Sequence, residues 1–161
     1  MHTGSFAFAR PSLGSWVSYG LGTANKNLPS FITIAPKQTY AGTQVYSSDF
    51  LPGAHQGTFL KPSKNPFENI VSKLPKSRQE LELEALQKLN HRHLFDRSGD
   101  PKAEARIKSF ETAFGMQMEV PDVFDFSKET DATHNLYGLK RGSTEGFGWQ
   151  CLAARRLIAV S

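Results

Sequence analysis

Residues 100–118, with the sequence DPKAEARIKSFETAFGMQM, contain the clearest helix signal of the chain. Asp100 followed by Pro101 is a typical helix start, because the carboxylate accepts from free backbone amides and proline fits the first turn. Apolar residues then recur at spacings of four, three, four and four, namely Ala103, Ile107, Phe110, Phe114 and Met118. This period predicts a helix with a stripe of core residues, and Pro121 is expected to end it.

Three more segments in residues 76–161 have helical periodicity. Ser77 is placed to cap a helix that runs to about Phe95, and the predicted inner face consists of Leu81, Ala85, Leu86, Leu89 and Leu94. Ser127 is placed to cap a short helix that Gly138 closes. The last predicted helix has an apolar face formed by Phe147, Cys151, Ala154 and Ile158. This part of the chain is therefore expected to be helical.

Residues 1–75 have a different character. Leu13, Trp16 and Val17 share one face of a short predicted helix that ends at the glycines 20 and 22. The segment 31–35, with the sequence FITIA, is rich in β-branched residues and is the only convincing strand. Residues 36–75 contain five prolines and show no sustained period. The expected architecture is α/β, mostly helical with one or few strands and a long irregular loop region.

The charge distribution, the lack of long apolar runs and the cysteine content exclude several classes of protein. The net charge of +4 over 161 residues is spread thinly, with no block of like charges, and a nucleic-acid surface would concentrate its basic residues. No apolar run is long enough to span a membrane, and a single cysteine excludes a disulfide scaffold. Residues 1–60 contain only four charged side chains and many aromatic ones. We expect this segment to be mostly buried against other protein or to line a cleft.

No catalytic motif stands out among the individual residues. Cys151 falls on an apolar helix face, where a thiol acts as a small hydrophobe. His91 and His93 are two residues apart, whereas a helical zinc site needs a spacing of four; an exposed helix end is the simpler interpretation. His55 lies in a glycine-rich loop, where a surface or hydrogen-bonding role is favoured over acid-base catalysis.

Several short motifs follow one another along the chain from residue 3 to about 157. The motifs are TGS at 3–5, RPSLGSWVSYGLGT at 10–23, NLP at 27–29, SDFLP at 48–52, QG at 56–57, LN at 89–90, EARI at 104–107, FGMQM at 114–118, LYG at 136–138 and CLAARRL at 151–157. Each piece is weak alone, but their order is specific. The ordered set resembles the domain-of-unknown-function 1501 family, a sulfatase-like branch of the alkaline phosphatase superfamily.

The resemblance implies that residues 1–161 are the middle portion of a single larger α/β hydrolase-like domain with an alkaline-phosphatase-like fold. The implied activity is hydrolysis of sulfate or phosphate esters with a divalent metal, and the nucleophile is expected upstream of Met1. The chain itself is expected to hold no metal and to be inactive alone. His2, Thr3, His55 and Gln56 are the residues expected to face the cleft.

The alternative is a small non-enzymatic helical module that binds other proteins through its aromatic first third. The two interpretations also differ in compartment. The chain as written contains no signal peptide and would stay in the cytoplasm, whereas relatives of the sulfatase-like family are commonly exported.

Overall fold

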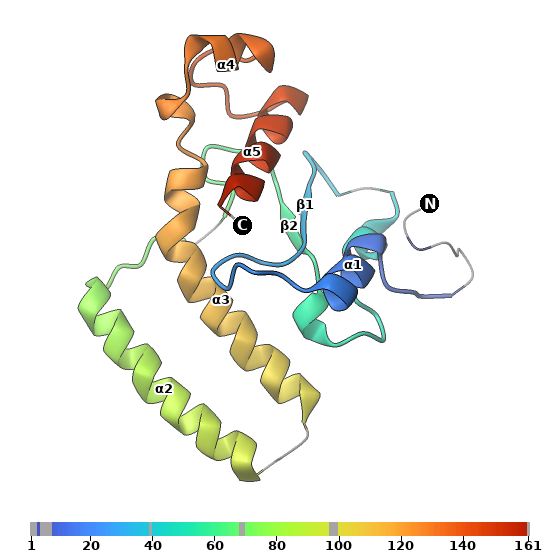
Figure 1. The fold of residues 1–161 in the computed structure, drawn as a ribbon, viewed down its shortest axis with the longest axis vertical. Helices are drawn as coiled ribbons and strands as arrows, with labels where there is room; N and C mark the ends of the chain where they lie inside the picture. Colours follow the sequence, from blue (N-terminus) through green and yellow to red (C-terminus); the bar gives the residue numbers. More distant parts are fainter. Residues whose placement is uncertain (1–2, 4–7, 39, 68–69, 97–99, 161) are drawn as a thin grey trace.

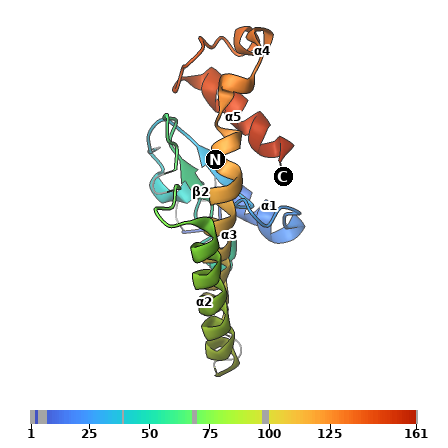
Figure 2. The ribbon, with the colours of Figure 1, turned by 90° about the vertical axis from the view of Figure 1, so that its left-hand side faces the viewer.

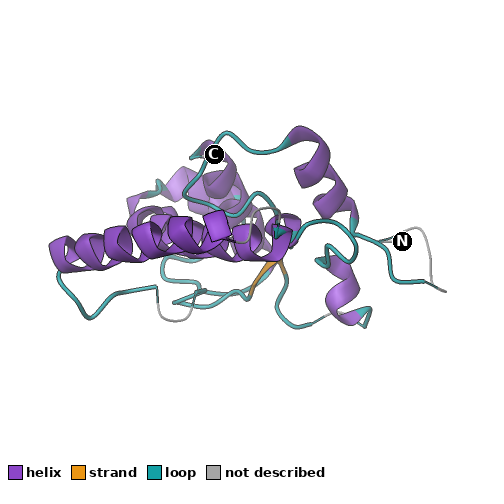
Figure 3. Cartoon of the chain, turned by 90° about the horizontal axis from the view of Figure 1, so that it is seen from below, coloured by secondary structure: helices purple, strands orange, loops and turns teal. Residues whose placement is uncertain are grey.

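The computed structural model describes residues 3, 8–38, 40–67, 70–96 and 100–160 (Figure 1). Five α-helices are found in this part of the chain: α1 Leu13–Leu21, α2 Lys76–Asp96, α3 Pro101–Val123, α4 Asp131–Leu136 and α5 Phe147–Ala159. Two short strands, β1 Ile32–Ile34 and β2 Thr58–Leu60, complete the fold together with three 3-10 turns. Figure 3 shows that helices and loops dominate the molecule. The prediction of a mostly helical α/β architecture is confirmed.

The two strands form one parallel pair in which Ile32 lies opposite Thr58 and Ile34 lies opposite Leu60. β1 matches the predicted strand. β2 falls in the segment that shows no period, so the expectation that β1 would be the only clear strand was wrong. Three residues are too few to display an alternation, and only the pairing with β1 makes them a strand. The connection between the strands contains the 3-10 turns η1 Gly42–Val45 and η2 Gly53–His55.

The helix starts follow local capping chemistry in some cases and not in others. Asp100 accepts from the backbone nitrogens of Lys102 at 3.0 Å and Ala103 at 3.3 Å, which confirms the predicted start of α3. α2 begins one residue before Ser77, and the carbonyl of Pro75 accepts from the backbone nitrogens of residues 78 and 79. The predicted cap at Ser77 was therefore wrong.

Two further helix boundaries differ from expectation. Pro121 lies inside α3, which ends two residues later at Val123; so close to the end, the proline removes little helix hydrogen bonding. Thr130, rather than Ser127, caps α4 and accepts from the backbone nitrogen of Thr133 at 3.2 Å. Gly138 follows this helix with a φ of 63°, so the predicted closure by glycine is confirmed.

The core lies between the sheet, the C-terminal half of α3, and α5. One cluster of buried side chains consists of Leu28, Met116, Val120, Val123 and Leu157. A second consists of Leu60, Phe126, Trp149, Leu152 and Ala153. Ile32 and Ile34 of β1 contact both clusters, so the two form a continuous apolar interior. Gly115 permits close approach of α3 to the loop before β1, because a Cβ there would lie 2.7 Å from the Asn27 Cα.

The buried faces of the helices differ from those that the apolar spacing predicts. On α3, Phe110 is 59% exposed and Met118 is 47% exposed, whereas Met116 and Val120 are buried. On α2, the predicted inner residues Leu81, Leu86 and Leu89 are more than half exposed. On α5, the exposed side chains include Phe147 and Ile158, and the buried ones are Trp149, Leu152, Ala153 and Leu157.

The arrangement of the long helices explains these differences. α2 and the first half of α3 extend side by side away from the sheet and α5 (Figures 1 and 2). Nothing in the described part of the chain covers their outer faces, so many apolar side chains there remain exposed. None of the helices in the described ranges combines the length and the apolar character that crossing a membrane requires.

Candidate functional site

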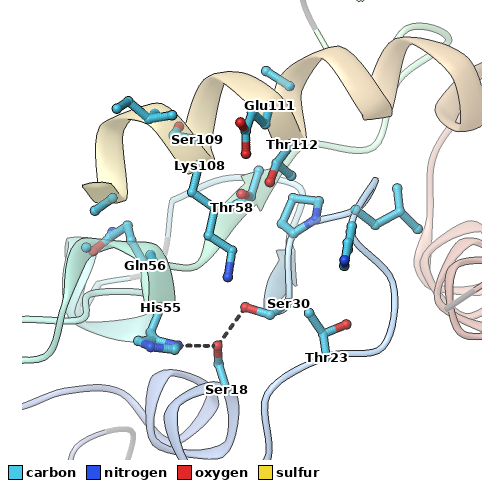
Figure 4. Close-up of a pocket in the computed structure, with 18 of the residues that line it drawn as sticks. Ser18, Thr23, Ser30, His55, Gln56, Thr58, Lys108, Ser109, Glu111 and Thr112 are labelled. Carbon is cyan, nitrogen blue, oxygen red and sulfur yellow. Dashed lines mark hydrogen bonds between the residues drawn. The ribbon is translucent and has the colours of Figure 1, made fainter. Parts of the chain in front are cut away.

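An open cleft of about 930 Å³ lies at the ends of β1 and β2 where both strands begin. Its walls come from the end of α1 and the loop after it, from η2, from the middle of α3 and from the end of α2. The lining residues are mostly polar on the side shown in Figure 4 and include Ser18, Ser30, His55, Thr58 and Lys108. These residues are far apart in sequence, so the cleft is a product of tertiary structure.

A row of serines lies on the inner face of α1, and the last of them, Ser18, lines the cleft. Ser12, Ser15 and Ser18 are spaced by three, so they share one helix face, and all three are buried. The Ser12 hydroxyl accepts from the Ser15 backbone nitrogen at 3.3 Å and caps the helix. The Ser15 hydroxyl donates to the carbonyl of Ser47 at 3.0 Å. These bonds hold α1 with its serines inward.

The opposite face of α1, on which Leu13, Trp16 and Val17 were predicted to lie together, is therefore turned outward. Leu13 is 72% exposed and Val17 is 50% exposed. The helix itself and its end at Gly22, which has a φ of 69°, agree with the expectation. The polar face is buried because its hydroxyls find partners there, and buried hydroxyls without partners would be costly.

Ser18, Ser30 and His55 form a continuous hydrogen-bond chain at the base of the cleft (Figure 4). The Ser18 and Ser30 hydroxyl oxygens are 2.6 Å apart, and the Ser18 oxygen lies 2.9 Å from Nδ1 of His55. Ser18 is buried, while Ser30 and His55 are half-buried. The chain therefore connects an internal hydroxyl with two side chains that reach the cleft.

The surroundings of His55 favour its neutral form. Burial lowers the pKa of His55 below its usual value, and the positive charge of Lys108 lowers it further. The ring also packs edge-on against Tyr19, with the ring centres 5.3 Å apart. A neutral imidazole with one nitrogen bonded to a hydroxyl retains one nitrogen for a ligand or a proton.

Lys108 projects from α3 across the cleft, and its amine points toward the Ser18, Ser30 and His55 side (Figure 4). The lysines that form ion pairs in the described part of the chain are Lys76, Lys88 and Lys128, and Lys108 is not among them. A lysine amine has three donors and carries its charge at neutral pH. The cleft thus places a cation opposite two hydroxyls and an imidazole.

Only some of the residues expected to face a cleft line the cavity. His55 and Gln56 both line the cavity. The side-chain carbonyl of Gln56 accepts from the backbone nitrogen of Ser48 at 2.9 Å and from its hydroxyl at 3.2 Å, so this oxygen stabilises the loop. Thr3 is not among the described residues that line the cavity, and His2 lies outside the described residues.

The other candidate groups take structural positions. His91 and His93 are exposed on the last turns of α2 and Cys151 is half-buried on α5. His134 is buried, and its Nε2 lies 3.2 Å from the carbonyl oxygen of Phe126. Within the described ranges, no three His, Cys, Asp or Glu side chains are grouped so that they could hold a metal ion.

Three members of the cleft, Ser18, Ser30 and Lys108, were not among the predicted site residues. The serine spacing of three on α1 was a usable signal, because it marks a polar face opposite the apolar one. Nothing in the local sequence distinguishes Ser30 or Lys108 from an ordinary loop serine or surface lysine. Only the packing of α3 over the start of β1 brings them together.

Comparison with known proteins gives one match. No curated protein and no solved structure matches the chain. The model of the family described as "Protein of unknown function (DUF1501)" matches residues 1–161, the entire sequence. The chain therefore belongs to the DUF1501 family.

Proposed function

We propose that this chain is one part of a larger sulfatase-like α/β hydrolase domain of the alkaline phosphatase superfamily, which hydrolyses sulfate or phosphate esters. The observation that carries the proposal is the two-stranded parallel sheet. Parallel sheets occur almost only inside α/β domains, with more strands and with both faces covered. Here all three residues of β1 are only half-buried, and the buried Thr33 hydroxyl has no hydrogen-bond partner among the described residues. Further strands beside this pair, together with a layer packed on the face from which Thr33 projects, would cover these residues and could offer the hydroxyl a partner.

The exposed apolar face of α1 supports the same proposal. Leu13 and Leu21 are 72% and 84% exposed, and Trp16 contacts the 67% exposed Phe50 edge-on. Contiguous apolar surface of this kind usually marks an interface. We propose that the remainder of the parent domain covers it, together with other aromatic side chains of residues 1–60.

The metal that the resemblance implies does not fit the described residues, because they contain no group of three potential ligands. We therefore place the divalent ion and its ligands in other parts of the parent domain and derive no step through it. The nucleophile is likewise expected outside this chain. His55 and Gln56 are proposed to face the substrate, and the proposed roles of His2 and Thr3 stay predictions.

The test compares a longer DUF1501 protein that contains this region with the 161-residue chain. Both are assayed with aryl sulfates and aryl phosphates, with and without added divalent metals. The longer protein is expected to hydrolyse at least one class of ester, and the chain alone is expected to hydrolyse neither. Failure of several longer members on all of these esters would contradict the proposal. Unchanged kinetics after replacement of the residues equivalent to His55 and Gln56 would remove these two from the substrate cleft.

The second candidate function is a protein-interaction module without catalytic activity. The observation that favours it is the aromatic group of Trp16, Tyr19 and Phe50, in which Trp16 packs edge-on against both other rings. Such rigid aromatic surfaces are common anchors in protein interfaces. A monomeric chain that melts cooperatively on its own would favour this module, whereas aggregation or a molten state would favour a part of a larger domain.

A further inference from the structure

The proposed function has His55 and Gln56 of this cleft facing a sulfate or phosphate ester, and the inference that follows deepens that proposal by naming further residues of the same site. A hydrogen-bond chain runs from Ser30 through Ser18 to Nδ1 of His55, with distances of 2.6 and 2.9 Å, and we call this chain the relay. The Lys108 amine points toward the relay from the opposite wall (Figure 4). We propose that the space between the Lys108 amine and the Ser30 hydroxyl binds a small oxyanion, such as a carboxylate, sulfate or phosphate group. The inference concerns binding alone and does not require hydrolysis.

The donors at this position suit an anion better than a neutral ligand. A lysine amine and a serine hydroxyl both donate to negatively charged oxygens, and such charge-assisted bonds are stronger than neutral ones. Thr58 and Thr112 supply further hydroxyls in the cleft lining. These groups come from α3 and from the starts of both strands, and all of them belong to the lining of the same cleft.

The charged groups that line the cleft balance formally, since two glutamates accompany two lysines, so the position of each charge decides where an anion can bind. Lys26 also lines the cavity and adds a second positive charge. Glu111 accepts from the Gln87 amide of α2 at 3.1 Å, which engages one of its oxygens away from the relay. Glu104 lies one turn before Lys108 on α3, and His91 of α2 lies at the rim. Lys108 is the charged residue whose amine points toward Ser18 and Ser30 in Figure 4, so the anion is expected beside Lys108.

The relay gives the bound anion a second effect. Each serine hydroxyl has one proton and can donate one hydrogen bond. If both hydroxyls donate within the chain, Ser30 donates to Ser18 and Ser18 donates to Nδ1 of His55. When the protons point toward His55, Ser30 has no proton left for a ligand. An anion beside Ser30 needs that proton, so Ser18 must then donate to Ser30, and His55 must donate from Nδ1 to Ser18.

Anion binding is thus expected to place a proton on Nδ1 of His55 and to leave Nε2 as the acceptor of the neutral ring. The negative charge also offsets the field of Lys108, one of the two causes that lower the pKa of His55. The pKa of His55 should therefore rise when the anion binds. The imidazole becomes a sensor of occupancy without contacting the ligand itself.

The test uses the complete 161-residue chain, uniformly labelled with ¹⁵N. Sulfate, phosphate and acetate are titrated at constant ionic strength against chloride, while the His55 ring nitrogens are followed by NMR. We expect a saturable change in which Nδ1 becomes the protonated nitrogen. Lys108→Ala should weaken binding about tenfold or more, because it removes a charge-assisted bond. Lys102→Ala, which removes the same charge from an exposed site on α3, should leave binding unchanged.

Ser18→Ala separates binding from the relay. This variant should keep most of the anion affinity, because Lys108 and Ser30 remain, but the His55 tautomer should no longer respond. Backbone amide shifts report retained folding of each variant and retained binding in the Ser18 variant. Lack of a saturable response in the wild-type chain, or equal binding by the Lys108 and Lys102 variants, would overturn the inference. A Ser18 variant whose His55 still changes tautomer would overturn the relay.

Two sources of the anionic group are distinguished by further titrations. Phenyl sulfate and phenyl phosphate present the group as the end of an organic ester, and the inorganic ions present it free. Tighter binding of the esters would support recognition of a larger ligand, and equal or weaker binding would support a site for the free ion. A longer DUF1501 protein that binds anions here but hydrolyses no ester would contradict the proposed function and leave this site intact.

Discussion

Arg156 of α5 connects three segments through one side chain. Its guanidinium donates from Nε to the carbonyl of Val123 at 2.6 Å and from Nη2 to the carbonyl of Asp122 at 2.7 Å. It also pairs with Glu129, and the Arg156 and Glu129 side chains are only 19% and 12% exposed. Carbonyls at the end of a helix lack intrahelical partners. Arg156 therefore supplies hydrogen-bond donors to carbonyls at the end of α3 and holds that end against α5.

Replacement of Arg156 by alanine should lower the free energy of unfolding by about 1–3 kcal/mol, the range for hydrogen bonds to charged groups and for buried acceptors left unpaired. Arg141→Ala is the matched control, because the Arg141–Asp131 pair is 55% and 80% exposed and should contribute less than about 1 kcal/mol. Urea titrations of both variants give the comparison. Equal losses of unfolding free energy in the two variants would show that the bonds from Arg156 to the end of α3 do not add to stability.

The stabilising ion pair between Arg156 and Glu129 depends on pH through the Glu129 carboxyl group. Its hydrogen bond with Arg156 is the main cause that holds the pKa of this carboxyl below its usual value, and Arg155 adds to the effect. A carboxylate with a depressed folded pKa stabilises the protein fully above the unfolded pKa, and this stability is lost as the pH falls through the folded value. The unfolded pKa of glutamate is about 4.3.

The stability difference between the wild-type chain and Glu129→Gln should therefore be constant above about pH 5 and should shrink as the pH falls below about 4.3. Chemical denaturation at a series of pH values measures it. Glu145→Gln, for which no comparable ion pair is found in the described residues, provides the control. A difference that stays constant down to pH 3, well below the usual glutamate pKa, would contradict this prediction.

At the scale of elements, the sequence predicts where helices occur better than which face each helix buries. Asp100 with Pro101 and the closing Gly138 act through bonds to neighbouring residues, so the local sequence contains their full signal. The buried face depends on what packs against the helix. On α1 the partners are backbone and hydroxyl groups, so the serines turn inward and Trp16 turns outward. Spacing of apolar residues cannot report such partners.

The site shows the same limit. His55 could be predicted as a hydrogen-bonded loop residue from its glycine-rich surroundings, and the structure gives it the partner Ser18. That partner is 37 positions away, and Lys108 arrives from a helix of the other half of the chain. The strand β2, three residues long, is likewise defined by pairing with β1 and not by its own pattern.

Two methionines of α3 test the observed helix face directly. Met116 is 8% exposed in the core, whereas Met118, part of the stripe predicted from spacing, is 47% exposed. Met116→Ala should lower stability by about 2–5 kcal/mol, because a buried large-to-small change loses transfer energy and leaves a cavity. Met118→Ala should cost under about 1 kcal/mol. The midpoints of thermal or urea unfolding decide between the two faces, and a larger loss for Met118→Ala would restore the predicted stripe.

At the scale of the whole molecule, the described chain has a core at one end and uncovered surface elsewhere. The buried clusters gather around the sheet, α5 and the second half of α3, while α2 contains no buried residue. Exposed large apolar side chains occur on every α-helix of the described residues. One group of them is on α1 and includes Leu13 and Val17; another is on α2 and includes Leu81 and Leu89. The two surfaces are different candidates for contact with the rest of a parent domain.

The α1 surface should dominate self-association of the isolated chain, because it is continuous with Trp16 and Phe50. We expect Leu13→Ser combined with Val17→Ser to reduce self-association, measured by sedimentation velocity, without lowering the melting temperature. Both side chains are at least half exposed, so their removal opens no cavity. The control pair Leu81→Ser and Leu89→Ser should have the weaker effect, because these leucines alternate with charged residues along α2. If instead the wild-type chain is monomeric and melts cooperatively, the interaction module becomes the better description. In an isolated part of a larger domain, this surface would be an exposed interface and would promote self-association.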